Sequence, residues 1–277
     1  MKKVIALAMA LCMAVSLVAC GGAEPAAPAS SAPAESAPAA SEAAPEAAPA
    51  ELTTVEAGKL IMSTNCGFPP YDGLDDNGQP VGIDMDIAAA LADKLGLEIQ
   101  IDDMDFDAAL LAVQNGKSDI VLAGVTVTDE RLLVMDFTTS YATGIQSVVV
   151  NEGSEIKTVD DLAGKLIGVQ RGTTSHIFCT DDFGEDSVVT YDNGLTAVQA
   201  LMNGQIDCVV VDDAPAQAFK TANPSLQILD SKYAVEDYAI GVAKGNTALL
   251  DALNAALEEL KADGTIDTII GNYIKAE

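Results

Sequence analysis

Short apolar runs alternate with longer segments of helical periodicity from about residue 59 to the end of the chain. The apolar runs predict β-strands, which we expect at residues 60–62, 81–83, 97–101, 120–123, 146–150, 166–169, 187–190, 208–211 and 239–243. Apolar residues that recur every three or four positions predict helices, the main ones at residues 84–96, 107–115, 195–202, 249–264 and 265–275. This alternation predicts an α/β fold with helices on the faces of parallel sheets. Because the pattern occurs twice before a shorter final unit, we expect two lobes and a C-terminus that returns to the first.

Polar residues at the ends of these segments predict caps and turns. Asp84 precedes a helical segment, so we expect its side chain to cap that helix. The Asn-Gly pair at 77–78 predicts a hairpin turn. Asp213 fits the N-cap of a later helix, because Pro215 then lies in the first turn, where a missing N–H does no harm. Asp212, at the carboxyl end of the preceding strand, is left without a capping role.

One stretch carries a candidate anion site. Residues 123–131 read Ala-Gly-Val-Thr-Val-Thr-Asp-Glu-Arg, which predicts a strand end, a tight turn and one helical turn. Small residues let backbone N–H groups face a ligand, and the Arg131 guanidinium can reach back over them, which suits a carboxylate. The chain holds two arginines, Arg131 and Arg171, against twelve lysines (14 − 2), so arginine's planar fork indicates a specific use. The alternative is a surface arginine paired with Asp129 or Glu130.

Composition excludes several function classes. The 277 residues are enough for two medium-sized lobes with hydrophobic cores. The net charge of −28 argues against a nucleic-acid partner, since proteins that bind phosphate backbones are basic. The five cysteines lack metal-ligand spacing, and the single histidine, His176, excludes a histidine-based zinc site and argues against a Ser-His-Asp triad. We therefore expect no metal, no cofactor and no catalytic residue.

The roles of four residues stay open. Cys66 falls in a loop beside the first strand, where a small half-buried side chain is the simplest interpretation. Cys179 and Cys208 belong to the same lobe, so a disulfide between them is geometrically open. His176 lies in the first turns of a helix, where we expect it to face solvent.

The N-terminal segment has the pattern of a secretion signal and a tether. Residues 1–19 begin with two lysines and continue with an apolar run too short to span a bilayer. A leucine three positions before Cys20 and a small residue just before it resemble the bacterial lipobox, which implies cleavage and lipidation at Cys20; a plain secretory signal is the alternative. Residues 20–54 contain six of the eleven prolines and no basic residue, which predicts an extended tether without a core.

The globular part resembles the family 3 extracellular solute-binding proteins of amino-acid ABC importers. The resemblance covers about residues 59 to 273 and rests on motifs in a fixed order. They are Phe-Pro-Pro-Tyr at 68–71, Gly-Ile-Asp-Met-Asp at 82–86, Gly-Lys-Ser-Asp at 116–119, the 123–131 stretch, Asp-Phe at 136–137, Gly-Thr-Thr at 172–174, Gly-Gln-Ile-Asp at 204–207, Val-Asp at 211–212 and Ala-Asp-Gly-Thr at 262–265.

The resemblance implies the periplasmic-binding-protein-like fold, in which two α/β lobes are joined by two crossing hinge strands. It places the crossings near residues 141–146 and 234–238. Lobe 1 then comprises residues 55–143 and 239–277, and lobe 2 comprises residues 144–238. Ligands of open α/β sheets bind at the carboxyl ends of the strands, which agrees with this placement.

The resemblance also implies a role for each site residue. Arg131 would grip the α-carboxylate of an amino acid, assisted by the backbone N–H groups of Thr126 and Thr174. Asp212 would take the α-ammonium, beside the Gly124 carbonyl. The ligand side chain would lie between aromatic residues and a polar residue, namely Phe68, Phe106 and Asn65. An aspartate is frequent in the family at the position of Asn65, so a neutral amide favours a polar or neutral ligand over a cationic one.

These observations predict an extracellular, lipid-anchored and monomeric binding protein that delivers a free L-amino acid to a membrane permease. The protein would bind and release its ligand without chemistry. The alternative is an enzyme on the same fold, similar to cyclohexadienyl dehydratase, which would need a positioned acid that Asp212 alone does not provide. A sensor or adhesin that keeps the amino-acid site is a third interpretation. Arg171 is open to contact with either the ligand or the importer.

Overall fold

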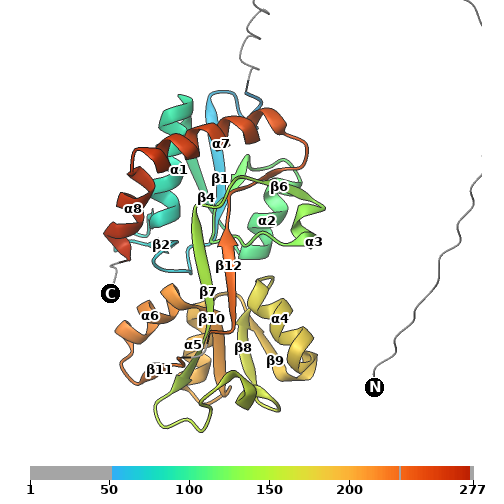
Figure 1. Ribbon diagram of the computed structural model, residues 1–277, viewed down its shortest axis with the longest axis vertical. Helices are drawn as coiled ribbons and strands as arrows, with labels where there is room; N and C mark the ends of the chain where they lie inside the picture. The colour runs from blue at the N-terminus through green and yellow to red at the C-terminus, as the bar shows by residue number, and fades with distance from the viewer. Residues whose placement is uncertain (1–51, 231, 275–277) are drawn as a thin grey trace, which may run out of the picture. The chain divides into compact units, whose positions relative to one another are not determined.

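The computed structural model describes residues 52–230 and 232–274, which lie in one compact unit, Ala48–Glu277 (Figure 1). The predicted signal peptide at 1–19, Cys20 and residues 20–51 of the predicted tether lie outside the described residues. So does residue 275 at the end of the last predicted helix. No helix in the described ranges is long and apolar enough to cross a membrane.

Lobe 1 is built on a five-stranded sheet with the order β4-β1-β5-β13-β6. Its strands are β1 Lys59–Thr64, β4 Glu98–Asp103, β5 Ile120–Val121, β6 Met135–Phe137 and β13 Gly241–Ala243. Its helices are α1 Ile83–Leu95, α2 Phe106–Gln114, the short α3 Asp129–Leu132, α7 Thr247–Ala262 and α8 Thr265–Tyr273. β1 pairs in parallel with β4 and β5, whereas β13 runs antiparallel to β5 and β6.

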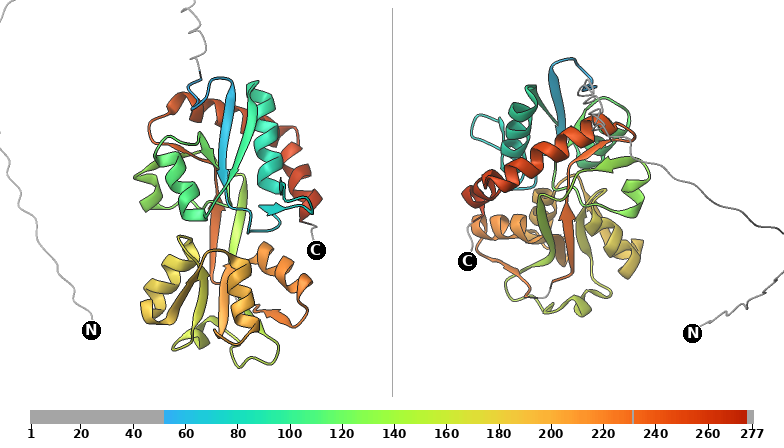
Figure 2. Two further views of the ribbon diagram at one scale, coloured as in Figure 1. Left: turned by 180° about the vertical axis from the view of Figure 1, so that it is seen from behind. Right: turned by 45° about the horizontal axis from the view of Figure 1, so that its top comes forward.

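Alternation of side chains explains how this sheet is covered on both faces. Ile120 and Leu122 belong to the core that includes α1, α7 and α8, whereas Val121 and Ala123 face the core that includes α2. Figure 2 shows α7 lying across the lobe. β13, α7 and α8 therefore complete lobe 1, which confirms that the C-terminal segment returns to the first lobe.

Lobe 2 is built on a six-stranded sheet in which β11-β7-β10-β8-β9 lie in order and β12 also pairs with β7. Its strands are β7 Ala142–Asn151, β8 Ile167–Gln170, β9 Val188–Tyr191, β10 Cys208–Asp212, β11 Leu226–Ile228 and β12 Ala234–Tyr238. Its α-helices are α4 Thr174–Phe183, α5 Gly194–Met202 and α6 Asp213–Ala222. Val209 and Val211 pack in the core with α5 and α6, while Cys208 and Val210 pack with Cys179 of α4.

Two paired strands join the lobes. β7 and β12 are antiparallel, from Ala142 opposite Tyr238 to Gln146 opposite Ala234 (Figure 1). The segments predicted to cross near 141–146 and 234–238 therefore lie side by side, and the two-lobed α/β fold is confirmed. Gly144 permits this close approach, because a Cβ atom there would collide with the Tyr238 side chain. The position of the Tyr238 hydroxyl thus depends on a residue without a side chain.

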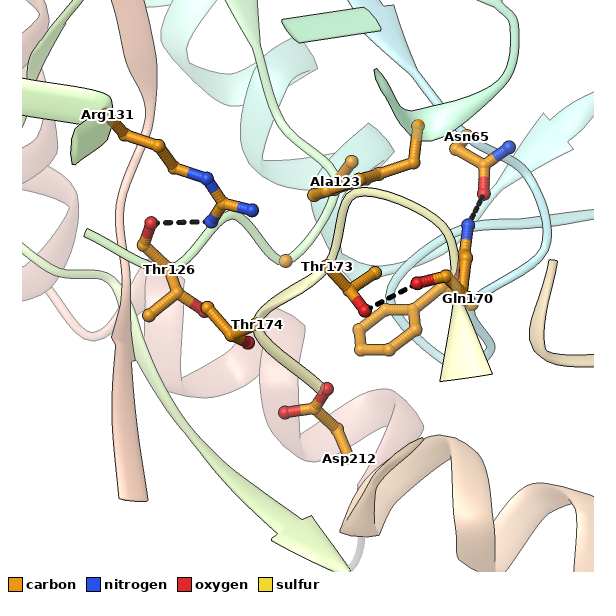
Figure 3. A pocket seen from close by; sticks show the side chains of 11 residues that line it. Asn65, Ala123, Thr126, Arg131, Gln170, Thr173, Thr174 and Asp212 are labelled. Carbon is orange, nitrogen blue, oxygen red and sulfur yellow. Dashed lines mark hydrogen bonds between the residues drawn. The ribbon is translucent and has the colours of Figure 1, made fainter. Parts of the chain in front are cut away.

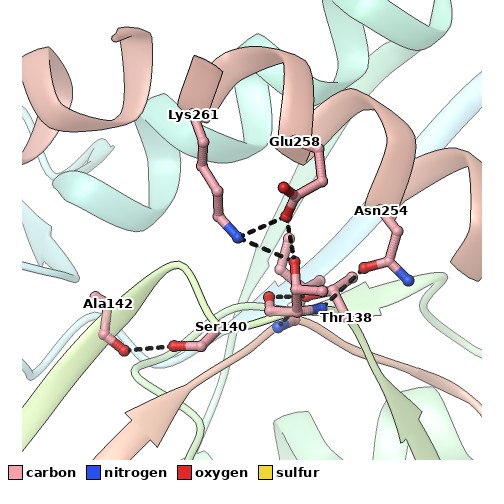
Figure 4. Close-up of polar contacts among 8 residues, drawn as sticks. Thr138, Ser140, Ala142, Asn254, Glu258 and Lys261 are labelled. Atoms are coloured by element: carbon pink, nitrogen blue, oxygen red, sulfur yellow. Dashed lines mark hydrogen bonds and ion pairs between the residues drawn. The ribbon is translucent and has the colours of Figure 1, made fainter.

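A polar cluster fixes the lobe 1 end of the crossing (Figure 4). The Thr139 N–H donates to Asn254 Oδ1 of α7 at 2.8 Å, and its hydroxyl donates to Glu258 Oε1 at 3.0 Å. Thr138 exchanges two hydrogen bonds with Ile240, each 3.1 Å long. The residues that precede β7 and follow β12 are therefore tied together, and this junction is bound to α7, the longest helix of lobe 1.

Two predicted caps are wrong, the first of them at α1. α1 begins at Ile83, and the Ile83 and Asp84 N–H groups donate to the carbonyls of Pro70 and Tyr71 at 3.1 Å. Because backbone carbonyls satisfy these first helical donors, Asp84 does not cap, and its fully buried side chain turns inward. The hairpin turn is confirmed, with β2 Gly73–Leu74 paired to β3 Pro80–Val81, but no strand spans 81–83.

The second wrong cap lies at α6. Asp212 occupies the N-cap position and Asp213 is the first helical residue, one position later than predicted. The Asp212 side chain nevertheless makes no capping hydrogen bond. Its carboxylate bonds Gln146 and Tyr238 of the crossing strands instead. The expectation that Asp212 is free of a capping task is therefore correct, although the predicted cap was not.

Candidate functional site

A pocket lies where the loops of the two lobes meet (Figure 3). Its walls come from the segments that follow β1, β4, β5, β8 and β10. The lining residues are Asn65, Phe68, Phe106, Ala123, Gly124, Thr126, Arg131, Gln170, Thr173, Thr174 and Asp212. All eight residues predicted to contact a ligand are in this set. Strand ends far apart in the sequence therefore converge on one site.

Arg131 projects into the pocket from a short helix whose start is capped. Thr128 Oγ1 accepts the Arg131 N–H at 3.2 Å, which sets the helical turn. The guanidinium donates from Nη1 to the Thr126 carbonyl at 2.8 Å and from Nη2 to the Gly172 carbonyl of lobe 2 at 3.1 Å. Its carbon atom lies 5.5 Å from the centre of the Phe106 ring. Only 8% of Arg131 is exposed, so the alternative of a surface arginine paired with Asp129 or Glu130 is wrong.

The charge of Arg131 survives this burial. Desolvation lowers the pKa of the guanidinium to about 10, and Glu236 opposes the shift. Arg131 is therefore a cation at neutral pH. Its guanidinium has five N–H donors, of which two are assigned to the backbone carbonyls of Thr126 and Gly172. Donors remain for an anion.

Two backbone N–H groups extend this donor array. Thr174 is the first residue of α4, where Thr173 is the N-cap and accepts the His176 N–H at 3.3 Å. Within the described part of the chain, the N–H groups of Thr126 and Thr174 donate to no protein acceptor. The start of α4 also carries the positive end of a helix dipole. This side of the pocket thus combines a guanidinium with amide donors from both lobes.

The opposite charge lies at the end of β10. Tyr238 Oη and Gln146 Nε2 each donate to the Asp212 carboxylate, the latter at 2.9 Å. Burial raises the pKa of Asp212 to about 7, the two hydrogen bonds lower it, and the nearby charge of Glu236 raises it further. No cation pairs with Asp212 among the described residues. Since a buried carboxylate gains most from an opposite charge, this end of the pocket suits an ammonium group.

A third part of the pocket is neutral and carries amides. Gln170 Nε2 donates to Asn65 Oδ1 across the two lobes at 2.8 Å, and Asn65 Nδ2 donates to the Met104 carbonyl at 2.8 Å. Phe68 and Phe106 supply apolar walls. Gln170, Thr173 and Ala123 were not predicted from the sequence. Gln170 is a polar residue at the end of a strand, as Asp212 is, so its position in the sequence could have identified it as a site residue.

Other residues singled out in the sequence lie elsewhere. Arg171 pairs with Asp192 at 2.9 Å on the surface and does not line the pocket. Cys66 is half-buried outside the lining, and burial raises the pKa of its thiol to about 12. Cys179 and Cys208 are buried free thiols, so the open disulfide is not formed. His176 is partly buried rather than solvent-facing, because its Nδ1 accepts the Gly172 N–H at 3.3 Å.

Behind the pocket, two buried carboxyl groups support the Gly124 turn. Asp84 Oδ2 accepts the Gly124 N–H at 2.9 Å, and Asp72 lies beside Asp84, near enough for one carboxyl to donate to the other. Asp72 Oδ2 and Asp84 Oδ1 have no hydrogen-bond donor among the described residues. A single proton between them would satisfy both oxygens. Burial raises the pKa of Asp72 well above its usual value and that of Asp84 to about 6, so Asp72 is the expected proton carrier.

Asparagine substitutions distinguish the two carboxyls. In D72N an amide N–H can replace the acid proton, so we expect the free energy of unfolding at about pH 7 to stay within about 1 kcal/mol of wild type. In D84N the Gly124 N–H loses its carboxylate, and we expect a loss of about 1–3 kcal/mol. Urea denaturation followed by circular dichroism measures both.

The pH dependence provides a second readout for the same pair. Because the folded pKa values are raised, the protonated form stabilises the fold at low pH, and this contribution is lost as the pH rises through the folded pKa of about 6 for Asp84. We expect D72N to weaken this loss, because the asparagine cannot release a proton as the pH rises. Equal destabilisation by D72N and D84N would show that Asp72 is not the proton carrier.

Comparison with known proteins gives consistent matches. The family model of the bacterial extracellular solute-binding proteins, family 3, matches residues 60–276. The L-cystine-binding protein TcyJ of Escherichia coli (strain K12) is 33% identical over 226 residues, 80% of this chain and 85% of that protein. ABC transporter arginine-binding protein 1 of the same strain is 34% identical over 218 residues, 77% of this chain and 89% of that protein.

A solved structure gives the same match at the level of the fold. An ancestral arginine-binding protein bound to glutamine has a TM-score of 0.76 and 41% identity, over 79% of this chain and 99% of that chain. All three proteins are named for binding, and each name gives an amino acid as the ligand.

Proposed function

Since the chain belongs to the bacterial extracellular solute-binding proteins, family 3, we propose that it captures one free L-amino acid and delivers it to the permease of an ABC importer. The observation that carries the proposal is the pair of opposite charges in one pocket, Arg131 in lobe 1 and Asp212 in lobe 2. A free amino acid carries the matching charges on one carbon atom. We propose that the protein does this as a monomer and catalyses no reaction.

The proposed binding mode follows from the donors and acceptors of the pocket. The α-carboxylate would lie against the Arg131 guanidinium and the N–H groups of Thr126 and Thr174. The α-ammonium would lie against Asp212 and the Gly124 carbonyl. Because these groups come from both lobes, a bound amino acid favours the closed arrangement of the lobes by its differential affinity for that arrangement.

The ligand side chain would lie between Phe68 and Phe106 and reach the amides of Asn65 and Gln170. The relatives are named for cystine and arginine, and the ancestral protein binds glutamine, so the choice of side chain varies among similar proteins. Neutral amides offer both donors and acceptors and no charge. We therefore propose a polar, uncharged side chain, with glutamine as the first amino acid to test.

The two arginines of the chain provide a matched test of the carboxylate clamp. Arg131→Ala removes the only guanidinium that lines the pocket in the described ranges, and we expect Kd for the bound amino acid to rise at least about thirtyfold. Arg171→Ala removes an exposed arginine paired with Asp192 and should leave Kd unchanged. The measurement is isothermal titration calorimetry against the twenty amino acids, after refolding to remove bound ligand.

Two outcomes of this screen would count against the proposal. Absence of heat with all twenty amino acids would contradict amino-acid binding itself. Wild-type affinity in Arg131→Ala, with folding shown by circular dichroism, would contradict the assigned clamp but leave amino-acid binding standing.

A single substitution tests the choice of side chain. Asn65→Asp places a carboxylate at the amide end of the pocket, and we expect the affinity for arginine relative to glutamine to rise roughly ten- to hundredfold, the gain of one charge-assisted hydrogen bond. Asn77→Asp, in the turn between β2 and β3, adds the same charge away from the pocket and serves as the control. An unchanged arginine to glutamine ratio in Asn65→Asp would place the ligand side chain elsewhere.

We further propose that Cys20 is lipidated and holds the protein at the extracellular face of the cell membrane. The support is the apolar run of residues 4–18 ahead of a small residue and Cys20. In bacteria that express the full chain, Cys20→Ser should abolish incorporation of labelled fatty acid and move the protein from the detergent phase to the aqueous phase. Cys66→Ser is the matched control. Labelled Cys20→Ser protein would contradict the assignment.

A further inference from the structure

Glu236 is a buried acidic residue near the pocket. It was not predicted from the sequence, and the proposed binding mode gives it no role. It lies on the crossing strand β12, and only 6% of the residue is exposed. Its Oε2 accepts hydrogen bonds from Gln146 Nε2 at 2.7 Å and from Thr174 Oγ1 at 3.0 Å. Its Oε1 is buried without a hydrogen-bond donor in the described part of the chain. Such an oxygen is costly to bury unless it carries or receives a proton.

Glu236 and Asp212 share one amide. The Nε2 atom of Gln146 donates to Asp212 Oδ2 at 2.9 Å and to Glu236 Oε2 at 2.7 Å. The orientation of this amide is fixed because Ser175 Oγ donates to Gln146 Oε1 at 2.5 Å. The two carboxyl groups are thus held on either side of a single NH₂ group, and both residues are buried.

The carboxyl groups of Asp212 and Glu236 outnumber the cations that act on them. Arg131 is the cation whose charge acts on Glu236, and no ion pair joins it to either acid among the described residues. The other groups that face Asp212 are the phenols of Tyr238 and Tyr71, which are neutral. Two ionised carboxylates would therefore oppose one guanidinium. Like charges that accept from the same amide group disfavour a second ionisation.

We propose that Asp212, held beside the charge of Glu236, carries a proton before a ligand enters, and that the ammonium group of the amino acid displaces this proton to solvent. The proposal rests on the proposed function. The entering zwitterion keeps its own protons, its ammonium replaces the proton of Asp212 as the positive partner of that carboxylate, and the released proton passes to the buffer. Glu236 is thereby a positioning residue that couples amino-group capture to pH.

The coupling has a defined sign. Burial and Glu236 raise the pKa of Asp212 to about 7, whereas an ammonium beside it favours the ionised form and lowers that pKa. Below about pH 7 binding must therefore release a proton, and affinity increases with pH. Above about pH 7 the acid is already ionised, and affinity no longer changes with pH.

Calorimetry counts the proton directly. Titration of wild type with its amino acid at about pH 6, in buffers of different ionisation enthalpy, should show close to one proton released per ligand bound. Between about pH 5 and 6, Kd should fall by up to about tenfold per pH unit, and it should level off above about pH 7.5. Zero proton release together with a constant Kd between about pH 5 and 7.5 would overturn the proposal.

Two nearly isosteric substitutions on β12 test the role of Glu236. Glu236→Gln keeps an acceptor for Gln146 and Thr174 but removes the charge, so the rise in affinity should move to lower pH and proton release at about pH 6 should fall at least twofold. Asp237→Asn is the control, because Asp237 is an exposed neighbour whose carboxylate faces Thr143 and not the pocket. A Glu236→Gln profile identical to wild type would overturn the assignment.

A measurement on the wild-type protein tests the proposal without a variant that must first be shown to fold. Infrared difference spectra at about pH 6 should show loss of a protonated-carboxyl C=O band when the amino acid binds, and no such change at about pH 8.5. A spectrum without this loss at the lower pH would overturn the proposal. If no amino acid binds at any pH, the proposed function fails; if binding occurs without proton release, only the coupling fails.

Discussion

The buried carboxylate of Asp212, without a protein cation of its own, is the constraint on which the site depends. Its hydrogen bonds from Gln146 and Tyr238 hold it in place, but only a proton or an opposite charge can neutralise it. A buried charge costs several kcal/mol unless an opposite charge is supplied. The cation of the pocket, Arg131, lies on the other lobe and forms no ion pair with Asp212. A ligand with a carboxylate and an ammonium close together would therefore supply the missing opposite charge to both Arg131 and Asp212.

The fold places these charges through neutral, local means. Thr128 sets the turn that carries Arg131, and Asp84 holds the Gly124 N–H from behind. Gly144 leaves room for the Tyr238 side chain, whose hydroxyl then reaches Asp212. Because each support comes from a different element, the pocket depends on the register between β7 and β12 as much as on its own lining. A change in the crossing strands is thus a change in the electrostatics of the site.

The sequence predicted features that depend on local chemistry. The small-residue turn at 123–131 and the scarcity of arginine identified Arg131, and alternating apolar runs identified most strands. The errors at Asp84 and Asp213 have one cause: a polar residue near a helix start was taken as its cap, whereas at Asp84 distant backbone carbonyls satisfied the first N–H groups. Glu236 could not be predicted, because it meets Gln146, 90 residues away, through strand pairing and Thr174, at the start of α4, through packing of that helix.

The contacts between the lobes explain why the ligand's charges, and not the protein alone, would decide closure. Across the pocket, Arg131 Nη2 bonds a carbonyl at 3.1 Å and Gln170 bonds Asn65 at 2.8 Å. The neutral bond contributes about 0.5–1.5 kcal/mol net and the bond from the charged guanidinium about 1.5–3 kcal/mol, and neither pairs opposite charges. In the proposed binding mode an amino acid would add a carboxylate at Arg131 and an ammonium at Asp212, where burial makes each interaction stronger than it is in water. A guest that lacked either charge would leave one buried ion uncompensated, so the energetic penalty for the wrong ligand arises at the same two residues that hold the right one.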